Sequence, residues 1–174
     1  QDKPVDDALL ERAYDLAKMG PTAANTCPMR LVFVKSPEAK EKLKPCLDKG
    51  NVEKSMTAPV VAIIGYDMEF YEHMSKLFPH NPGAREWYAG KPEVIFNTAF
   101  RSGSLQGAYF MLAARALGLD CGPMSGFNNQ KINEAFFAGT QIKSNFICAL
   151  GYGDRSKLFP RGPRFAFSEV CRIA

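Results

Sequence analysis

The feature that most limits the fold of this chain is one long helical stretch near its middle. From about residue 93 to residue 117, apolar side chains recur at helical spacing, at Ile95, Ala99, Leu105, Ala108, Leu112 and Ala116. Gly103 and Gly107 lie inside the stretch, although each weakens a helix by roughly 1 kcal/mol relative to alanine. Glycine at both positions indicates that another helix or a ligand comes close to this side. We therefore expect a long central helix on which the other elements pack.

Shorter segments on both sides of this helix alternate between helix and strand. Apolar spacing and capping residues predict helices over 5–20, 37–47, 68–78 and 129–137 and strands over 31–35, 58–66 and 145–153. The alternation lacks the regular spacing of βαβ units, so the sequence predicts an α+β fold with a sheet flanked by helices. With 174 residues and no internal repeat, residues 1–174 are expected to form one domain.

Two segments lack this periodicity. Residues 79–92 are rich in glycine and proline but carry Trp87 and Tyr88, which indicates a mobile loop that covers a site as a lid. Residues 154–174 contain four arginines and several proline and glycine residues, with too little pattern to fold on themselves. We interpret this tail as an arm that packs elsewhere, such as on a partner subunit.

Charge and composition argue against several classes of partner. The net charge of +4 comes from 22 basic and 18 acidic residues scattered along the chain, which is unlike the basic stripe of a nucleic-acid-binding protein. The first residues are too polar for a signal peptide, and no uncharged apolar run approaches the roughly 18 residues of a membrane span. We therefore expect a cytoplasmic protein with neither nucleic acid nor membrane as a partner. The five widely spaced cysteines are expected to be reduced thiols.

Most catalytic motifs are absent from the sequence. His73 and His80 are the only histidines and have no second ligand pair, so no metal site is predicted. There is no GxSxG, P-loop or GxGxxG motif, which argues against hydrolases and kinases. Four segments of small residues and cations remain, namely "GPTAANTCPMR" at 20–30, "NVEK" at 51–54, "GPMSGF" at 122–127 and "RGPR" at 161–164. Each alone is weak evidence, because each has a simpler alternative: an ordinary turn for 20–30, a solvated link for 51–54, a solubilising tail for 161–164 and a left-handed turn that closes a strand for 122–127.

In their order and spacing, these segments resemble the FMN-dependent nitroreductase superfamily. The resemblance also includes the "LQGAYFMLAARALGL" helix, the "GYG" strand end and the basic arm, so it covers nearly the whole chain. Within the superfamily, the sequence most closely resembles the malonic semialdehyde reductase (RutE-type) subgroup in the segments "GNVEKSMTAPVVAI", "FYEHMSKLFPH" and "KSNFICALGYGD". The resemblance implies a homodimer with a four-stranded antiparallel sheet between helices. In that dimer the C-terminal arm adds a strand to the partner's sheet, and two FMN molecules lie at the interface.

The resemblance further implies which residues contact the flavin ring. One segment lies against the ring and presents a main-chain N–H to the nitrogen that exchanges hydride; it comprises Pro123, Met124, Ser125 and Gly126. Many family members have an acid at the position of Ser125, so only the backbone role carries over. Lys54 is implied at the polar edge of the ring, where a cation favours the anionic reduced form, and Asn51 on the ribityl side.

Two further groups of cofactor contacts are implied. The family's "PSSxN" turn, which meets the flavin of the dimer, corresponds here to Pro21, Thr22, Ala23 and Asn25. Arg161 and Arg164 match the phosphate contact, with Lys157 a weaker candidate, because a phosphate needs cationic donors. The family's N-terminal arginine and serine motif is missing, and the chain begins with Gln rather than Met. We therefore expect that a leading segment is lacking.

The implied reaction is a two-step transfer in which NADH or NADPH reduces FMN and a small acceptor then takes the hydride. No protein side chain is expected to react covalently. If malonic semialdehyde is the acceptor and 3-hydroxypropionate the product, a cation must hold its carboxylate, and the candidates are Arg101, Arg30 and Arg85. If the acceptor is a nitroaromatic or a quinone, the candidates for stacking are Phe70, Tyr71, Trp87 and Tyr88. A flavin-binding protein without turnover is the alternative from another class.

Overall fold

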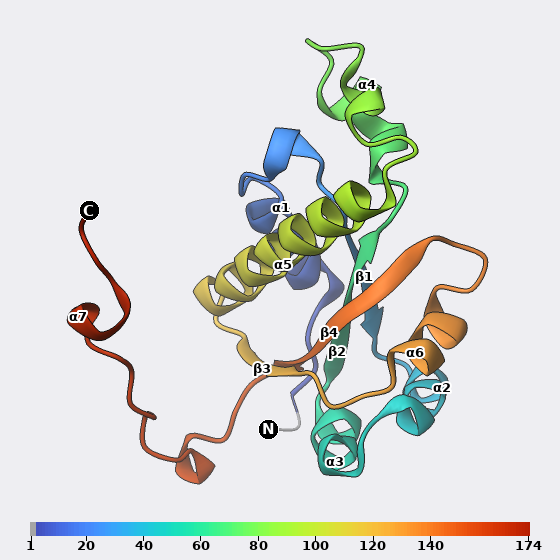
Figure 1. The fold of residues 1–174 in the computed structure, drawn as a ribbon. Helices are drawn as coiled ribbons and strands as arrows, with labels where there is room; N and C mark the ends of the chain where they lie inside the picture. The colour runs from blue at the N-terminus through green and yellow to red at the C-terminus, as the bar shows by residue number, and fades with distance from the viewer. Residues whose placement is uncertain (1–2) are drawn as a thin grey trace.

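A computed structural model describes residues 3–174 and contains one antiparallel sheet of four strands (Figure 1). The strand order is β1-β2-β4-β3, with β1 at Met29–Val34, β2 at Val60–Asp67, β3 at Asp120–Met124 and β4 at Ile142–Gly151. All eight residues of β2 are buried, because the strand is central and both faces of the sheet are covered. β1 and β3 are the two edges. The predicted α+β fold with a sheet flanked by helices is confirmed.

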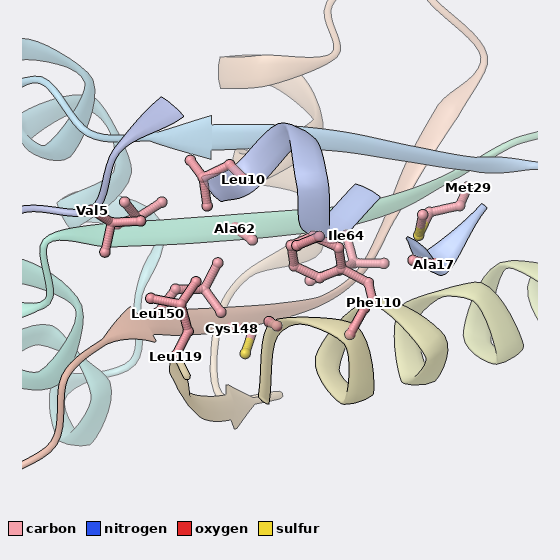
Figure 2. Packing of buried hydrophobic residues seen from close by; sticks show 14 residues of the cluster. Val5, Leu10, Ala17, Met29, Ala62, Ile64, Phe110, Leu119, Cys148 and Leu150 are labelled. Atoms are coloured by element: carbon pink, nitrogen blue, oxygen red, sulfur yellow. The ribbon is translucent and has the colours of Figure 1, made fainter. Parts of the chain in front are cut away.

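Helices cover both faces of the sheet. Figure 1 shows α1 (Asp7–Ala17) and α5 (Pro92–Ala116) on one face and α2 (Pro37–Leu43) and α6 (Asn129–Phe136) on the other. Side chains alternate along β2, so Ala62 and Ile64 point to the first face and Val61 and Ile63 to the second. Figure 2 shows Leu10 of α1 and Phe110 of α5 on the same side of the sheet as Ala62 and Ile64, in one cluster. The sheet therefore separates two hydrophobic clusters.

The long central helix is confirmed, and its two inner glycines face the sheet. A Cβ at Gly103 would lie 2.9 Å from Cβ of Tyr66, and a Cβ at Gly107 would lie 2.7 Å from the ring of Phe146. These distances are shorter than side-chain packing allows, so glycine lets α5 approach strands β2 and β4. The expectation that another helix or a ligand makes this approach is wrong, because the neighbours are strands of the sheet.

The segment between β2 and α5 is packed rather than an open loop. It contains two short 3-10 helices, Phe70–His73 and Ala84–Trp87, and the one-turn helix α4 (Met74–Leu77). Phe70 and Met74 are fully buried and form a small cluster with Tyr66 of β2 and with Tyr88. Figure 1 shows this segment extending beyond one end of α5. Of the two aromatic residues expected on a lid, Tyr88 is part of this hydrophobic cluster, whereas Trp87 is 43% exposed.

The C-terminal arm leaves the body of the molecule after β4 (Figure 1). Residues 155–174 are all exposed and include only the short 3-10 helix Arg155–Lys157 and the one-turn helix α7 (Phe167–Val170). The arm exposes several large apolar side chains, namely Leu158, Phe159, Phe165, Phe167 and Ile173. An arm without a local core agrees with the interpretation that it packs elsewhere.

Two elements differ from the sequence prediction. Residues 49–57, for which no helix was predicted and a solvated link was the alternative for Asn51 and Lys54, form the helix α3 (Lys49–Thr57). Residues 120–124 form the strand β3. The helix was missed because its apolar residues are few, and the strand because Gly122 and Pro123 are poor strand formers. The five cysteines are free thiols, as expected. Within residues 3–174, no helix is both long enough and apolar enough to cross a membrane.

Candidate functional site

A groove of about 800 Å³ lies beside the β3 edge of the sheet. Its wall combines α3, β3, the end of β4 and the start of the arm, through residues that include Lys54, Thr57, Gly122, Pro123, Met124 and Leu158. This volume is in the range of small-molecule and cofactor sites. The groove therefore brings together Lys54 and the first half of the predicted flavin segment.

The segment at the end of β3 turns sharply without left-handed backbone. Pro123 pairs with Cys148 of β4, which is compatible with proline because β3 is an edge strand. The Phe127 N–H donates to the Ser125 carbonyl over 3.1 Å and closes a turn around Gly126. Neither Gly122 nor Gly126 has a positive φ angle. The alternative of a left-handed turn at 122–127 is therefore wrong.

Helix α3 holds this turn from one side. The side-chain amide of Asn51 donates to the Gly126 carbonyl over 2.9 Å, and the Asp48 N–H donates to the same oxygen over 3.1 Å. The Ser55 hydroxyl lies 3.9 Å from the Met124 sulfur and is buried. The Asn51 amide is thus bonded to the flavin segment, whereas the sequence predicted that it reaches the ribityl chain.

Unpaired donors lie in the groove and in the segment that follows its β3 wall. Within residues 3–174, neither the Ser125 N–H nor the Gly126 N–H donates a hydrogen bond. Lys54 is exposed, and within the same residues it forms no ion pair. Two free main-chain donors, one free cation and the apolar side chains of Pro123 and Met124 fit a flat ring that becomes anionic on reduction.

The loop before β1 is strained and fixes its own side chains. Ala24, Asn25 and Cys27 have φ angles of 46°, 52° and 41°, which non-glycine residues seldom adopt. The Thr22 hydroxyl accepts the Cys27 N–H over 3.2 Å, and the Asn25 amide donates to the Leu77 carbonyl over 2.8 Å. Thr22 and Asn25 therefore shape the loop and tie it to α4. Strain of this kind concentrates at functional sites, so the loop stays a candidate for binding.

One chain does not bring the predicted flavin residues together. The 21–25 loop precedes β1, and the 123–126 segment follows β3, so the two groups lie at opposite edges of the sheet. Three strand spacings separate the edges, or roughly 14 Å at the usual strand distance. Arg161 and Arg164 lie in the exposed arm, where Arg164 donates to the Gly162 carbonyl over 3.1 Å. The predicted set is therefore divided among three places.

Two of the three arginines considered for an acceptor carboxylate are already paired. Arg30 donates to Asp67 over 2.6 Å and also to the Met29 carbonyl. Arg85 donates to both carboxylate oxygens of Glu72, at 2.6 and 2.8 Å, and lowers the pKa of that acid. Neither guanidinium is free for a substrate. Arg101 is exposed and, within residues 3–174, forms no ion pair.

Only one of the four aromatic candidates is well exposed. Phe70 is fully buried and Tyr88 nearly so, with their ring centres 4.9 Å apart. Tyr71 lies under the Arg85 guanidinium at 5.6 Å. Trp87 is 43% exposed. Phe70 and Tyr88 are therefore core residues, and the expectation that they stack on an acceptor is wrong.

An exposed aromatic pair lies on α5 and was not predicted from the sequence. Phe96 and Phe100 stack with ring centres 5.7 Å apart and an interplanar angle of 14°, and Tyr66 packs edge-on against both. Both rings remain more than 40% exposed. Their spacing of four residues in a predicted helix is a signal that places both on one face. The helix was predicted from the apolar residues of its inner face, and Phe96 and Phe100 lie outside that set.

The far end of the groove is closed by an ionised aspartate. Asp120 accepts the Gly153 N–H over 2.7 Å, which with Arg115 lowers the pKa of its carboxyl below the ordinary value. Next to it, the Cys148 thiol donates a hydrogen bond to Cys121, and this bond together with burial raises the pKa of Cys148, so the inner thiol stays neutral. These contacts connect β3 to the segment that leads into the arm.

Comparison with known proteins gives consistent results. Residues 1–153 match the Nitroreductase family. A Burkholderia lata protein provisionally named NADH dehydrogenase/NAD(P)H nitroreductase is 63% identical over 173 residues, which cover 99% of this chain and 88% of that protein. A Cupriavidus pinatubonensis protein with the same provisional name is 60% identical over 173 residues, or 98% of this chain and 88% of that protein. The crystal structure of an Exiguobacterium sibiricum protein in complex with FMN aligns with a TM-score of 0.87 at 18% identity, over 99% of this chain and 89% of that one.

Together, the fold, the groove and these matches define the class of the molecule as an α+β oxidoreductase. More specifically, the chain belongs to the nitroreductase family. The predicted fold, enzyme class and FMN cofactor agree with these findings. The malonic semialdehyde reductase subgroup is a finer assignment than they provide.

Proposed function

We propose that this chain is an FMN-dependent NAD(P)H oxidoreductase that reduces a small acceptor as a homodimer. The observation that carries the proposal is the groove at β3. The free cation of Lys54 lines this groove, and Ser125 and Gly126, which follow its β3 wall, have unpaired N–H groups. The FMN bound to the Exiguobacterium sibiricum protein and the NAD(P)H in the names of the relatives support the choice of cofactors.

In this proposal the protein orients the cofactor and stabilises charge. FMN, when bound, supplies the hydride-transfer chemistry. The N–H groups of Ser125 and Gly126 would donate to polar atoms of the ring, and Lys54 would stabilise the negative charge of its reduced form. Pro123 and Met124 provide an apolar surface that limits water at the ring. No side chain of the groove needs to act as a nucleophile.

Two observations support the homodimer: exposed apolar side chains, and predicted flavin contacts that lie in separate places on one chain. Besides the arm, helices α1 and α5 and the turn after α1 expose large apolar side chains, namely Leu16, Met19, Phe96, Phe100, Leu105 and Leu112. Exposed apolar area of this extent is typical of an interface. A second chain would bring its 21–25 loop to the β3 edge of the first. Arg161 and Arg164 would then bind the phosphate from the arm. A cytoplasmic location stays a prediction.

For the acceptor we favour a nitroaromatic or quinone over malonic semialdehyde. Of the three arginines considered, the ion pairs of Arg30 and Arg85 leave Arg101 to hold a carboxylate. Phe96, Phe100 and the exposed Trp87 offer surfaces for a flat ring. Malonic semialdehyde remains the second candidate because Arg101 is free of acidic partners in residues 3–174.

Steady-state turnover with the three acceptors tests this proposal. Purified full-length protein saturated with FMN is mixed with NADH or NADPH in a stopped-flow instrument, and bleaching of the flavin is followed before any acceptor is added. We then expect faster turnover with the nitroaromatic and the quinone than with malonic semialdehyde, and no effect of Arg101→Ala on the first two. Flavin that binds but is not bleached would identify a non-catalytic flavin-binding protein. Dependence of malonic semialdehyde turnover on Arg101 would reverse our order of acceptors.

A further inference from the structure

We infer that Asn51 is a positioning residue, which acts on the flavin through the main chain of the 125–127 turn and not by touching the cofactor. The inference rests on the proposed function, because it concerns the same groove. It differs from the contact predicted from the sequence, in which the Asn51 amide reaches the ribityl side.

The first step is the contact between Asn51 and Gly126. The amide nitrogen lies 2.9 Å from the Gly126 carbonyl oxygen, which also accepts the Asp48 N–H over 3.1 Å. A Cβ at Gly126 would lie only 2.5 Å from the same amide nitrogen, so no other residue fits at this position without moving Asn51. The amide and the glycine are therefore matched in shape as well as in hydrogen bonding.

The second step follows from planar peptide bonds. The Gly126 carbonyl and the Phe127 N–H belong to one trans peptide and point in opposite directions. When α3 binds the carbonyl, the Phe127 N–H is directed back to the Ser125 carbonyl, which it contacts at 3.1 Å. The Ser125 carbonyl shares its peptide with the Gly126 N–H, so that N–H is directed to the opposite side. The Asn51 amide, together with the Asp48 N–H on the same oxygen, thus fixes two consecutive peptide planes and the direction of a free donor.

Neighbouring contacts hold the turn at both ends. Ser55 follows Asn51 by one helical turn, and its hydroxyl lies 3.9 Å from the Met124 sulfur before the turn. After the turn, the Asn128 N–H donates to the Cys46 carbonyl over 2.8 Å. Since the ends are fixed independently, removal of the Asn51 amide should release the orientation of the peptides without unfolding the segment.

The test compares Asn51→Ala with Asn145→Ala in full-length protein. Asn145 is a matched control because its part-buried amide also makes one hydrogen bond, to the Ser104 hydroxyl at 2.9 Å, between β4 and α5. The FMN dissociation constant and the midpoint potential are measured for each variant, and hydrogen exchange of the Phe127 amide is measured without FMN. Asn51→Ser replaces Asn51→Ala if the alanine variant does not fold.

We expect three effects of Asn51→Ala that Asn145→Ala does not produce. Exchange at Phe127 becomes faster, because its N–H is no longer directed to Ser125. FMN binds more weakly, and reduced FMN loses roughly tenfold more affinity than oxidised FMN, since a donor to a charged group is worth more than one to a neutral group. That tenfold difference lowers the two-electron midpoint potential by about 30 mV.

Other outcomes overturn the inference in distinguishable ways. Equal loss of affinity for both redox forms, with an unchanged midpoint, would indicate a direct contact of Asn51 with a part of the cofactor that carries no redox charge. Lower stability with unchanged exchange at Phe127 would indicate a purely structural side chain. Failure of the unsubstituted protein to bind FMN would refute the proposed function itself, whereas the exchange measurement would still test the control of the turn by Asn51.

Discussion

Replacing Gly103 with alanine tests whether close approach of the sheet explains glycine inside α5. The added Cβ would lie 2.9 Å from the Tyr66 Cβ, whereas ordinary contacts between such atoms begin near 3.4 Å. Tyr66 is in the central strand β2 and is 8% exposed. Because the contacted atom is next to the backbone, it cannot turn aside as the end of a side chain can. The helix or the strand must move by a few tenths of an ångström.

Two effects of opposite sign determine the result. Alanine stabilises a helix interior by about 1 kcal/mol relative to glycine. Overpacking of a well-packed core costs about 1 to 3 kcal/mol, and the upper end applies because the backbone must shift. The net change expected for Gly103→Ala is a loss of about 2 kcal/mol in the free energy of unfolding. For a chain of this length, that corresponds to a melting temperature lower by about 4 to 8 °C.

Urea unfolding followed by far-UV circular dichroism measures this change. Protein concentration and FMN are held constant, since association and ligand binding both alter apparent stability. Gly50→Ala is the control, because Gly50 is also helical but its added Cβ would have no neighbour within 4 Å. That variant should gain about 0.5 to 1 kcal/mol. If Gly103→Ala is stabilised to the same extent, the sheet does not require glycine at position 103 and our reasoning is wrong.

Three further predictions concern the groove and the arm. Lys54→Ala should lower the midpoint potential of bound FMN by about 20 to 45 mV in a redox titration, the value expected for loss of a partly solvated cation near the ring; an unchanged midpoint would place Lys54 away from it. At neutral pH the unsubstituted protein should be more stable than Asp120→Asn, and this difference should disappear as pH falls below 3.8. The reason is that the folded-state pKa of Asp120 is depressed, so its contribution to stability is lost when the carboxylate is protonated. Urea unfolding from pH 7 to pH 2 measures the difference, and a constant difference would refute the prediction. Deletion from Lys157 onward should yield a monomer without flavin in size-exclusion chromatography with absorbance detection, whereas a yellow dimer would show that the arm is dispensable.

The sequence predicted elements where one physical signal dominated. Helix α5 combines 25 residues of helical spacing with a proline in its first turn, so its existence did not depend on tertiary contacts. Strand β2 is an apolar run that only a buried position accommodates. By contrast, β3 contains Gly122 and Pro123, and it forms a strand because β4 offers it a partner at the sheet edge. Information of that kind lies in the rest of the fold rather than in the local sequence.

For the site, the sequence indicated where main chain is exposed but not which side chains form ion pairs with each other. Small residues indicated exposed main chain over 123–126, and Pro123 and Met124 of this segment line the groove. Contact of the segment with the flavin stays a prediction. The partners of Arg30 and Arg85 could not be predicted, since Asp67 and Glu72 are distant in sequence or lie in a segment with weak periodicity. A surface arginine and a paired arginine have the same appearance in a sequence.

The loop before β1 and the turn after β3 use opposite means to control their main chains. The loop stores strain in three left-handed residues and depends on local bonds such as that between Thr22 and Cys27. The turn contains no left-handed residue and takes its direction from helix α3 through Asn51. A strained loop is stable only while its surroundings determine its shape, and part of the surroundings of this one is the segment that Asn25 binds at Leu77. Changes in the 68–91 segment should therefore alter the loop, whereas the groove at β3 should respond to changes in α3. In the proposed dimer these two halves meet at one flavin, so each half can be perturbed separately by a single substitution.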